Sequence, residues 1–257
     1  MSGLERRFSR FLERLVGVAR ADDRVVAVVG MGSTAARERV DEWSDHDFAL
    51  VTRPGFEDVF RHDLSWLPAS DRIALSVVED HGGVKVVYDD GHVLEFGITD
   101  VAGLAGWKAN AYDVLTGPPE VHAAMAAIAV RPAGETAERD VALVLTQVLI
   151  GVGRARRGER LNASDVIRGQ AVGHLLRAAA GRLPLDRRAA LDDLDPTRRV
   201  EQAFPGLASR IERLLVLDVE ECARGLLDLT TELLEPGWPG FPRRGVDAVR
   251  RRLGWTG

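Results

Sequence analysis

The stretch that decides the fold covers residues 25–51 and reads VVAVVGMGSTAARERVDEWSDHDFALV. Its landmarks are an apolar run at 25–30, the dipeptide Gly32-Ser33, and the tripeptide Asp45-His46-Asp47 directly before a second apolar run. Short apolar runs bounded by glycine and polar residues favour buried strands. The stretch therefore predicts a strand, a glycine-serine turn that opens a short helix, and a second strand that begins with acidic residues.

Acidic residues on two predicted strands form a candidate metal site. Side chains alternate faces along a strand, so Asp45 and Asp47 project together while His46 points the other way. A third acid, Glu95, lies in the middle of a later strand, HVLEFGI at 92–98. Neighbouring carboxylates repel unless a cation lies between them, and Mg²⁺ prefers oxygen ligands. We therefore predict that Asp45, Asp47 and Glu95 are catalytic and bind Mg²⁺. The residues leave open whether Glu95 is a metal ligand or the general base.

Gly32 and Ser33 are predicted to bind the phosphates of a nucleotide. A glycine lets the backbone approach a phosphate, and the free N–H groups at the start of a helix attract anions. Together with the acids, this pattern indicates metal-dependent phosphoryl or nucleotidyl transfer. Taken alone, the dipeptide is compatible with an ordinary turn and helix cap, and the paired acids with a solvated strand edge.

The composition of the 257 residues is that of a soluble globular protein, with 46% hydrophobic and 28% charged residues. Cys222 is the only cysteine, which excludes an internal disulfide and favours a reducing, cytoplasmic location. No apolar stretch of the sequence approaches the roughly 20 residues of a membrane span, so no membrane partner is expected. The N-terminal residues also lack the apolar region of a secretory signal.

Charge is distributed unevenly along the chain. Residues 1–120 hold 13 Lys and Arg against 21 Asp and Glu, a net charge of −8, whereas residues 121–257 hold 21 against 18, a net charge of +3. An enzyme that acts on nucleic acid normally presents a basic groove to the phosphate backbone. The acidic first half argues against a nucleic-acid partner and favours a neutral or cationic small-molecule acceptor.

The sequence patterns divide the chain into two blocks. The first has predicted strands at 24–30, 46–52, 72–79, 84–88 and 92–98, and its β pattern ends at Asp100. After the break at Gly117-Pro118-Pro119, apolar residues recur at helical spacing almost to the end. We therefore predict an α+β protein, with a catalytic domain at 1–120 that holds a mixed β-sheet and flanking helices. A helical bundle at 121–257 is predicted to bind the acceptor.

Gly32-Ser33, Asp45-His46-Asp47 and Glu95 resemble the signature of the nucleotidyltransferase superfamily. With a helical bundle after them, they look like the adenylyltransferases that modify aminoglycoside or lincosamide antibiotics, and residues 138–166 are similar to the start of the helical domain in the streptomycin/spectinomycin type. The resemblance implies transfer of AMP or another NMP from ATP or another NTP to a hydroxyl of a small molecule, with release of pyrophosphate and a role in antibiotic resistance. Two residues depart from the pattern. His46 stands where the family usually has an aliphatic residue, and Gln147 falls near a phosphate-binding arginine of the streptomycin type.

Three other functions use the same motif. An antitoxin-type or protein-modifying nucleotidyltransferase is usually shorter and lacks a helical domain of this size. A nucleic-acid nucleotidyltransferase is disfavoured by the acidic first half, and a non-catalytic nucleotide-binding module by the presence of all three carboxylates. The sequence does not name the acceptor or choose between ATP and other nucleotides. Asp140, at the start of a long predicted helix, either contacts a cationic acceptor or complements the helix dipole.

Overall fold

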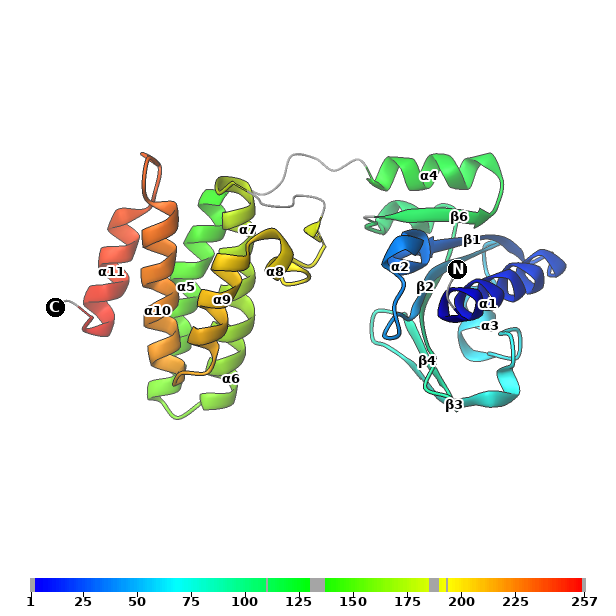
Figure 1. The fold of residues 1–257 in the computed structure, drawn as a ribbon, viewed down its shortest axis with the longest axis horizontal. Coiled ribbons are helices and arrows are strands. Elements are labelled where there is room, and N and C mark those ends of the chain that lie inside the picture. Colours follow the sequence, from blue (N-terminus) through cyan, green and yellow to red (C-terminus); the bar gives the residue numbers. More distant parts are fainter. Residues whose placement is uncertain (1–2, 110, 130–136, 185–189, 193, 256–257) are drawn as a thin grey trace. The chain divides into compact units, whose positions relative to one another are not determined.

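The chain forms two compact units, Met1–Pro132 and Ala133–Gly257, in the computed structural model, which describes residues 3–109, 111–129, 137–184, 190–192 and 194–255 (Figure 1). The described part of the first unit holds the β-sheet, and that of the second holds only helices and their connections. The protein is therefore α+β, as predicted. The predicted division after residue 120 falls inside α4 (Pro119–Ala129). Because Val121 and Met125 of α4 are buried against the sheet, this helix belongs to the first unit.

The first unit is built on a six-stranded mixed sheet with the strand order β3-β4-β5-β2-β1-β6. Its strands are β1 (Val25–Met31), β2 (His46–Thr52), β3 (Ile73–Val78), β4 (Val84–Tyr88), β5 (Val93–Asp100) and β6 (Tyr112–Thr116). Strand β2 pairs with β5 in parallel, and every other neighbouring pair is antiparallel.

Strand β6 corrects the prediction that the β pattern ends at Asp100. It pairs antiparallel with β1 at the edge of the sheet, where Asp113 lies opposite Gly30. None of its five residues is fully buried, and the sequence YDVLT shows no continuous apolar run. An edge strand needs only one partner, so its pairing left no strong pattern in the sequence.

Helices cover the two faces of the sheet in the first unit. They are α1 (Gly3–Ala21), α2 (Gly32–Ala35), α3 (Glu57–His62) and α4, with 3₁₀ turns η1 (Arg37–Arg39), η2 (Ser70–Arg72) and η3 (Gly103–Gly106). Phe48 and Leu50 of β2 share one core with residues of α1 and α3. The alternate residues Ala49 and Val51 share a second core with residues of η3 and α4. The alternation along β2 therefore separates the two layers.

A histidine pair, of which His46 is buried and His92 partly buried, joins α1 to the start of β2. His46 Nε2 lies 3.1 Å from the Phe8 carbonyl oxygen, and His46 Nδ1 lies 2.7 Å from His92 Nε2. A carbonyl only accepts, so Nε2 of His46 carries the proton, and Nδ1 accepts from His92. The Phe8 ring stacks on the His46 ring at a centroid distance of 3.7 Å. Burial lowers the pKa of His46 to about 3, and burial also lowers the pKa of His92.

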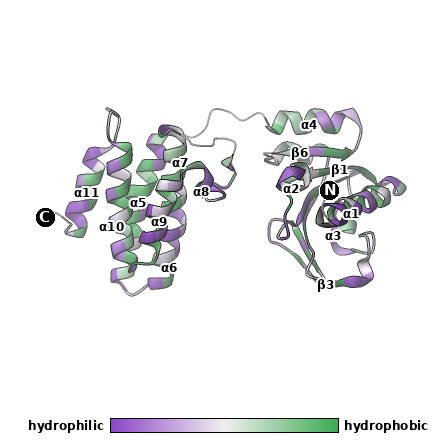
Figure 2. Cartoon of the chain, in the orientation of Figure 1, coloured by the Kyte–Doolittle hydropathy of each residue, from purple (hydrophilic) through white to green (hydrophobic). Residues whose placement is uncertain are grey.

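The second unit is a helical bundle. Its helices are α5 (Ala137–Arg156), α6 (Arg160–Ser164), a π-helix η4 (Asp165–Ala171), α7 (Val172–Arg182), α8 (Val200–Ala203), α9 (Pro205–Leu215), α10 (Val219–Leu234) and α11 (Arg243–Leu253). Helix α5 packs against α7, α10 and α11. Figure 2 shows both hydrophobic and hydrophilic residues on these helices. Among the described helices, none is long and apolar enough to cross a membrane.

Asp140 is a buried acid that joins two helices of the bundle. Its Oδ1 lies 2.8 Å from Nδ1 of His174 and accepts a hydrogen bond from Nε of Arg177 at 3.3 Å. Asp140 lies on α5, and its two partners lie on α7. A buried carboxylate needs such partners, so these contacts give Asp140 a structural role whatever else it binds.

The buried His46 predicts that stability is sensitive to acid. Between pH 6.5 and about 3 the unfolded state protonates His46 while the native state does not, so stability falls as pH decreases through this window. The slope contributed by His46 should approach about 1.4 kcal/mol per pH unit. In urea titrations with EDTA from pH 7.5 to 5, His46→Leu should be less stable at pH 7.5 but lose less stability on acidification. If the free energy of unfolding fell equally with pH in both proteins, the assignment of His46 as a buried neutral histidine would be wrong.

Candidate active site

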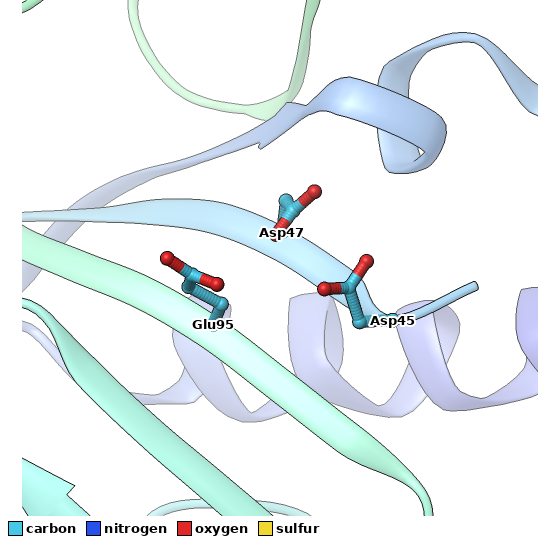
Figure 3. Close-up of side chains that lie close together, drawn as sticks. All are labelled: Asp45, Asp47 and Glu95. Atoms are coloured by element: carbon cyan, nitrogen blue, oxygen red, sulfur yellow. The ribbon is translucent and has the colours of Figure 1, made fainter. Parts of the chain in front are cut away.

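The three predicted acids lie together on two adjacent strands. Asp45 directly precedes β2, Asp47 is its second residue, and Glu95 lies on β5. The parallel register places Asp47 opposite Glu95, and one carboxylate oxygen from each of the three residues lies within 4.8 Å of the other two (Figure 3). Parallel strands begin at the same edge of a sheet, so acids near the starts of β2 and β5 meet there.

The donor set suits a hard divalent cation. Mg²⁺ binds oxygen at about 2.1 Å, so two oxygens on opposite sides of the ion lie about 4.2 Å apart. The separations within the cluster extend to 4.8 Å, so small side-chain rotations would bring the oxygens to this geometry. Asp45 and Asp47 are partly buried, whereas 47% of the Glu95 side chain is exposed. The cluster therefore has oxygen donors on a rigid sheet and an open approach through Glu95.

The acids face the same side of the sheet as the core beneath α4. Alternation puts Asp47 on the face of Ala49, and Glu95 on the face of Gly97. A Cβ atom on Gly97 would lie 2.3 Å from Trp107, so the indole ring packs directly on the backbone of β5. Trp107 therefore packs against the core on this face of the sheet.

Gly32 lies against the Asp47 carboxylate, which leaves no space for a side chain at this position. Its φ is +53°, and a Cβ atom there would lie 2.6 Å from Oδ2 of Asp47. Ser33 Oγ donates to the carbonyl oxygen of Asp45 at 3.4 Å. Helix α2 has only four residues, so its dipole is small. The structure brings Gly32 and Ser33 beside the acids, and their binding of phosphate stays a prediction.

The sequence patterns did not predict a role for two residues near the acids, Thr34 and Lys85. Thr34 is buried, and its Oγ1 accepts a hydrogen bond from the backbone N–H of Asp47 at 3.0 Å. Lys85 lies on β4 directly opposite Glu95, with its Nζ 3.8 Å from Glu95 Oε1 and 2.9 Å from Glu79 Oε1. Its hydrogen bond to Glu79, and next the charge of Glu95, raise the pKa of Lys85. The signal for Lys85 was a lone charge within the apolar strand VKVVY.

His46 and Gln147 have distinct surroundings. His46 is buried in the opposite core, where it meets Phe8 and His92 rather than the acids. Gln147 lies on α5 of the second unit and donates to Oε1 of Gln170 at 3.1 Å. The His46 side chain therefore forms its hydrogen bonds on the face of the sheet away from the cluster.

Similarity to known proteins is found among solved structures. No protein-family description and no curated protein sequence matches the chain. Among solved structures, the chain is similar to an aminoglycoside 6-adenyltransferase from Bacillus subtilis, with 14% sequence identity and a TM-score of 0.31. The match covers 97% of this chain and 92% of that one.

We expect Gly32→Ala to damage both the fold and the cluster. Gly91 provides a matched control, because its φ is +81° but a Cβ atom there would meet nothing within 4 Å. In Gly91→Ala, only the strain of a residue with a Cβ atom at positive φ should lower the free energy of unfolding. We expect a loss of about 1–2 kcal/mol in urea titrations. Gly32→Ala should lose more stability than this and should also weaken Mn²⁺ binding, measured by electron paramagnetic resonance. Equal stability losses with unchanged Mn²⁺ binding would show that Asp47 accommodates the added methyl group.

Thr34→Val should loosen Asp47 without changing the volume of the core. The substitution removes the acceptor of the Asp47 backbone N–H, which should cost about 1–2 kcal/mol of stability. Thr34→Ser keeps the hydroxyl and serves as the control. If the hydroxyl positions Asp47, Mn²⁺ should bind more weakly to the valine variant than to the serine variant. The opposite order would assign Thr34 to packing alone.

Proposed function

We propose that this protein is a Mg²⁺-dependent nucleotidyltransferase that moves AMP, or another NMP, from an NTP to a hydroxyl group of a small molecule and releases pyrophosphate. The observation that supports this most is the juxtaposition of Asp45, Asp47 and Glu95 beside the Gly32 turn. Three carboxylates with oxygens within 4.8 Å of one another can hold the divalent cation on which nucleotidyl transfer depends.

Each residue of the candidate site has a proposed role in transfer. Asp45, Asp47 and Glu95 would hold Mg²⁺, which when bound neutralises the phosphate charge that develops during attack at the α-phosphate. Gly32 leaves room for the Asp47 carboxylate, and its backbone and the Ser33 hydroxyl would bind the nucleotide phosphates. In the alternative role of Glu95, as general base rather than metal ligand, its exposure, the highest of the three acids, would let the acceptor hydroxyl reach it.

The acceptor is proposed to be a neutral or cationic small molecule of the aminoglycoside or lincosamide kind. The acidic first 120 residues, with a net charge of −8, would repel a nucleic-acid backbone and attract an amine-bearing acceptor. The helical unit is proposed to bind this acceptor, and antibiotic resistance is the corresponding biological role. ATP is the proposed donor because the resemblance is to adenylyltransferases.

Asp47→Asn should abolish transfer while the fold persists. A neutral amide binds Mg²⁺ poorly, so we expect the rate of acceptor-dependent pyrophosphate release to fall at least about a thousandfold, or about 4 kcal/mol in transition-state stabilisation. Asp71→Asn changes an exposed acid of η2 outside the cluster and serves as the control. Circular dichroism should be unchanged in both variants. Activity of Asp47→Asn within tenfold of the wild type would overturn the metal assignment.

A labelling experiment separates the proposed function from its alternatives. The full chain is incubated with ATP labelled at the α-phosphate, Mg²⁺, and in turn aminoglycosides, lincosamides, tRNA or a protein mixture. Label on a small molecule supports the proposal. Label on tRNA or protein would favour a nucleic-acid or antitoxin-type enzyme, and ATP binding with no transfer to any acceptor would favour a non-catalytic nucleotide-binding module.

A further inference from the structure

Lys85 extends the row of charged residues that crosses the sheet. It lies on β4 opposite Glu95 of β5, which lies opposite Asp47 of β2. The three side chains therefore share one face. The Lys85 ammonium lies 3.8 Å from a carboxylate oxygen of Glu95 and 2.9 Å from one of Glu79, and 41% of the side chain is exposed. A cation thus borders the acidic cluster on the side away from Asp47.

The residue type at this position is informative. Of the 34 Lys and Arg residues in the chain, only Lys85 and Lys108 are lysines. Arginine suits fixed, two-pronged ion pairs, whereas lysine is a point charge on a flexible stem that can follow a moving partner. A lone lysine between two carboxylates therefore fits a cation that changes partners.

The distances place Lys85 within reach of a bound polyphosphate. A cation held by Glu95 would have its own oxygen ligands about 2.1 Å away, so a phosphate oxygen on that cation would lie within about 4 Å of the Glu95 carboxylate. The Lys85 ammonium already lies at a comparable distance from this carboxylate, 3.8 Å. Both groups would thus border the same carboxylate, and the flexible Lys85 side chain could close the remaining gap to the phosphate oxygen.

We propose that Lys85 binds the polyphosphate of the nucleotide and that Glu79 holds its ammonium group in place until the nucleotide arrives. This inference rests on the proposed function, because it assumes a nucleotide at the acidic cluster. It assigns the neutralisation of the triphosphate to the first unit. The competing explanation is that Lys85 only ties β4 to β5 through its ion pairs with Glu79 and Glu95.

The test compares Lys85→Met with Lys108→Met, which removes the other lysine at an exposed position outside the cluster. Binding of tripolyphosphate and of ATP is measured by calorimetry with Ca²⁺, and binding of Mn²⁺ alone by electron paramagnetic resonance. We expect Lys85→Met to bind tripolyphosphate and ATP at least tenfold more weakly than wild type, with similar losses for both, because the lost contact is to phosphate. Its affinity for Mn²⁺ alone should be unchanged or higher, because a nearby positive charge is gone. Lys108→Met should match the wild type.

Two results would overturn the proposal. Polyphosphate binding by Lys85→Met equal to that of Lys108→Met would remove Lys85 from the phosphate site. Equal losses of Mn²⁺ and polyphosphate affinity would show that Lys85 merely holds Glu95 in place. Should Lys85→Met unfold, Lys85→Gln is measured in the same way. If the wild type binds tripolyphosphate through Lys85 but transfers label to no acceptor, the proposed function fails while this inference stands.

Discussion

The register between β2 and β5 is the constraint on which the rest of the first unit depends. A slip of one residue would move Phe48 and Leu50 from the core to the opposite face and bury Asp47 among apolar side chains. Burying a single unpaired carboxylate is far more costly than any contact such a slip would gain. The two cores that cover β2 therefore fix the register, and the register places Asp47 opposite Glu95.

Three like charges held this close repel, so the residues around them must keep the backbone in place. Thr34 binds the N–H of Asp47, Gly32 leaves space for its carboxylate, and Lys85 supplies a neighbouring positive charge. On the opposite face, His46 binds the Phe8 carbonyl and thereby joins α1 to the strand that carries the acids. Stability and the candidate site thus depend on the same strand. Burial keeps His46 neutral, and the hydrogen bond of His46 holds in place the strand whose adjacent residues, Asp45 and Asp47, are acidic.

The candidate site also shows how weak local signals combine. Gly32 and Thr34 are ordinary residues of a short helix, yet both contact Asp47 of the neighbouring strand. In the second unit, the buried contact of Asp140 with His174 and Arg177 has no counterpart in a motif, because it joins side chains 34 and 37 residues apart. Local patterns identify the elements, and long-range pairing decides which of their side chains meet.

Local sequence patterns predicted the α+β class, the strands β1 to β5, and the common face of Asp45, Asp47 and Glu95, because strand alternation and apolar periodicity are local properties of the chain. They missed β6, whose pairing with β1 leaves no apolar run, and they assigned α4 to the helical block although Val121 and Met125 pack on the sheet. Only the tertiary structure placed Lys85 beside Glu95, Thr34 behind Asp47, and His46 against Phe8. These contacts depend on strand order and helix packing, which arise from interactions between residues far apart in the chain.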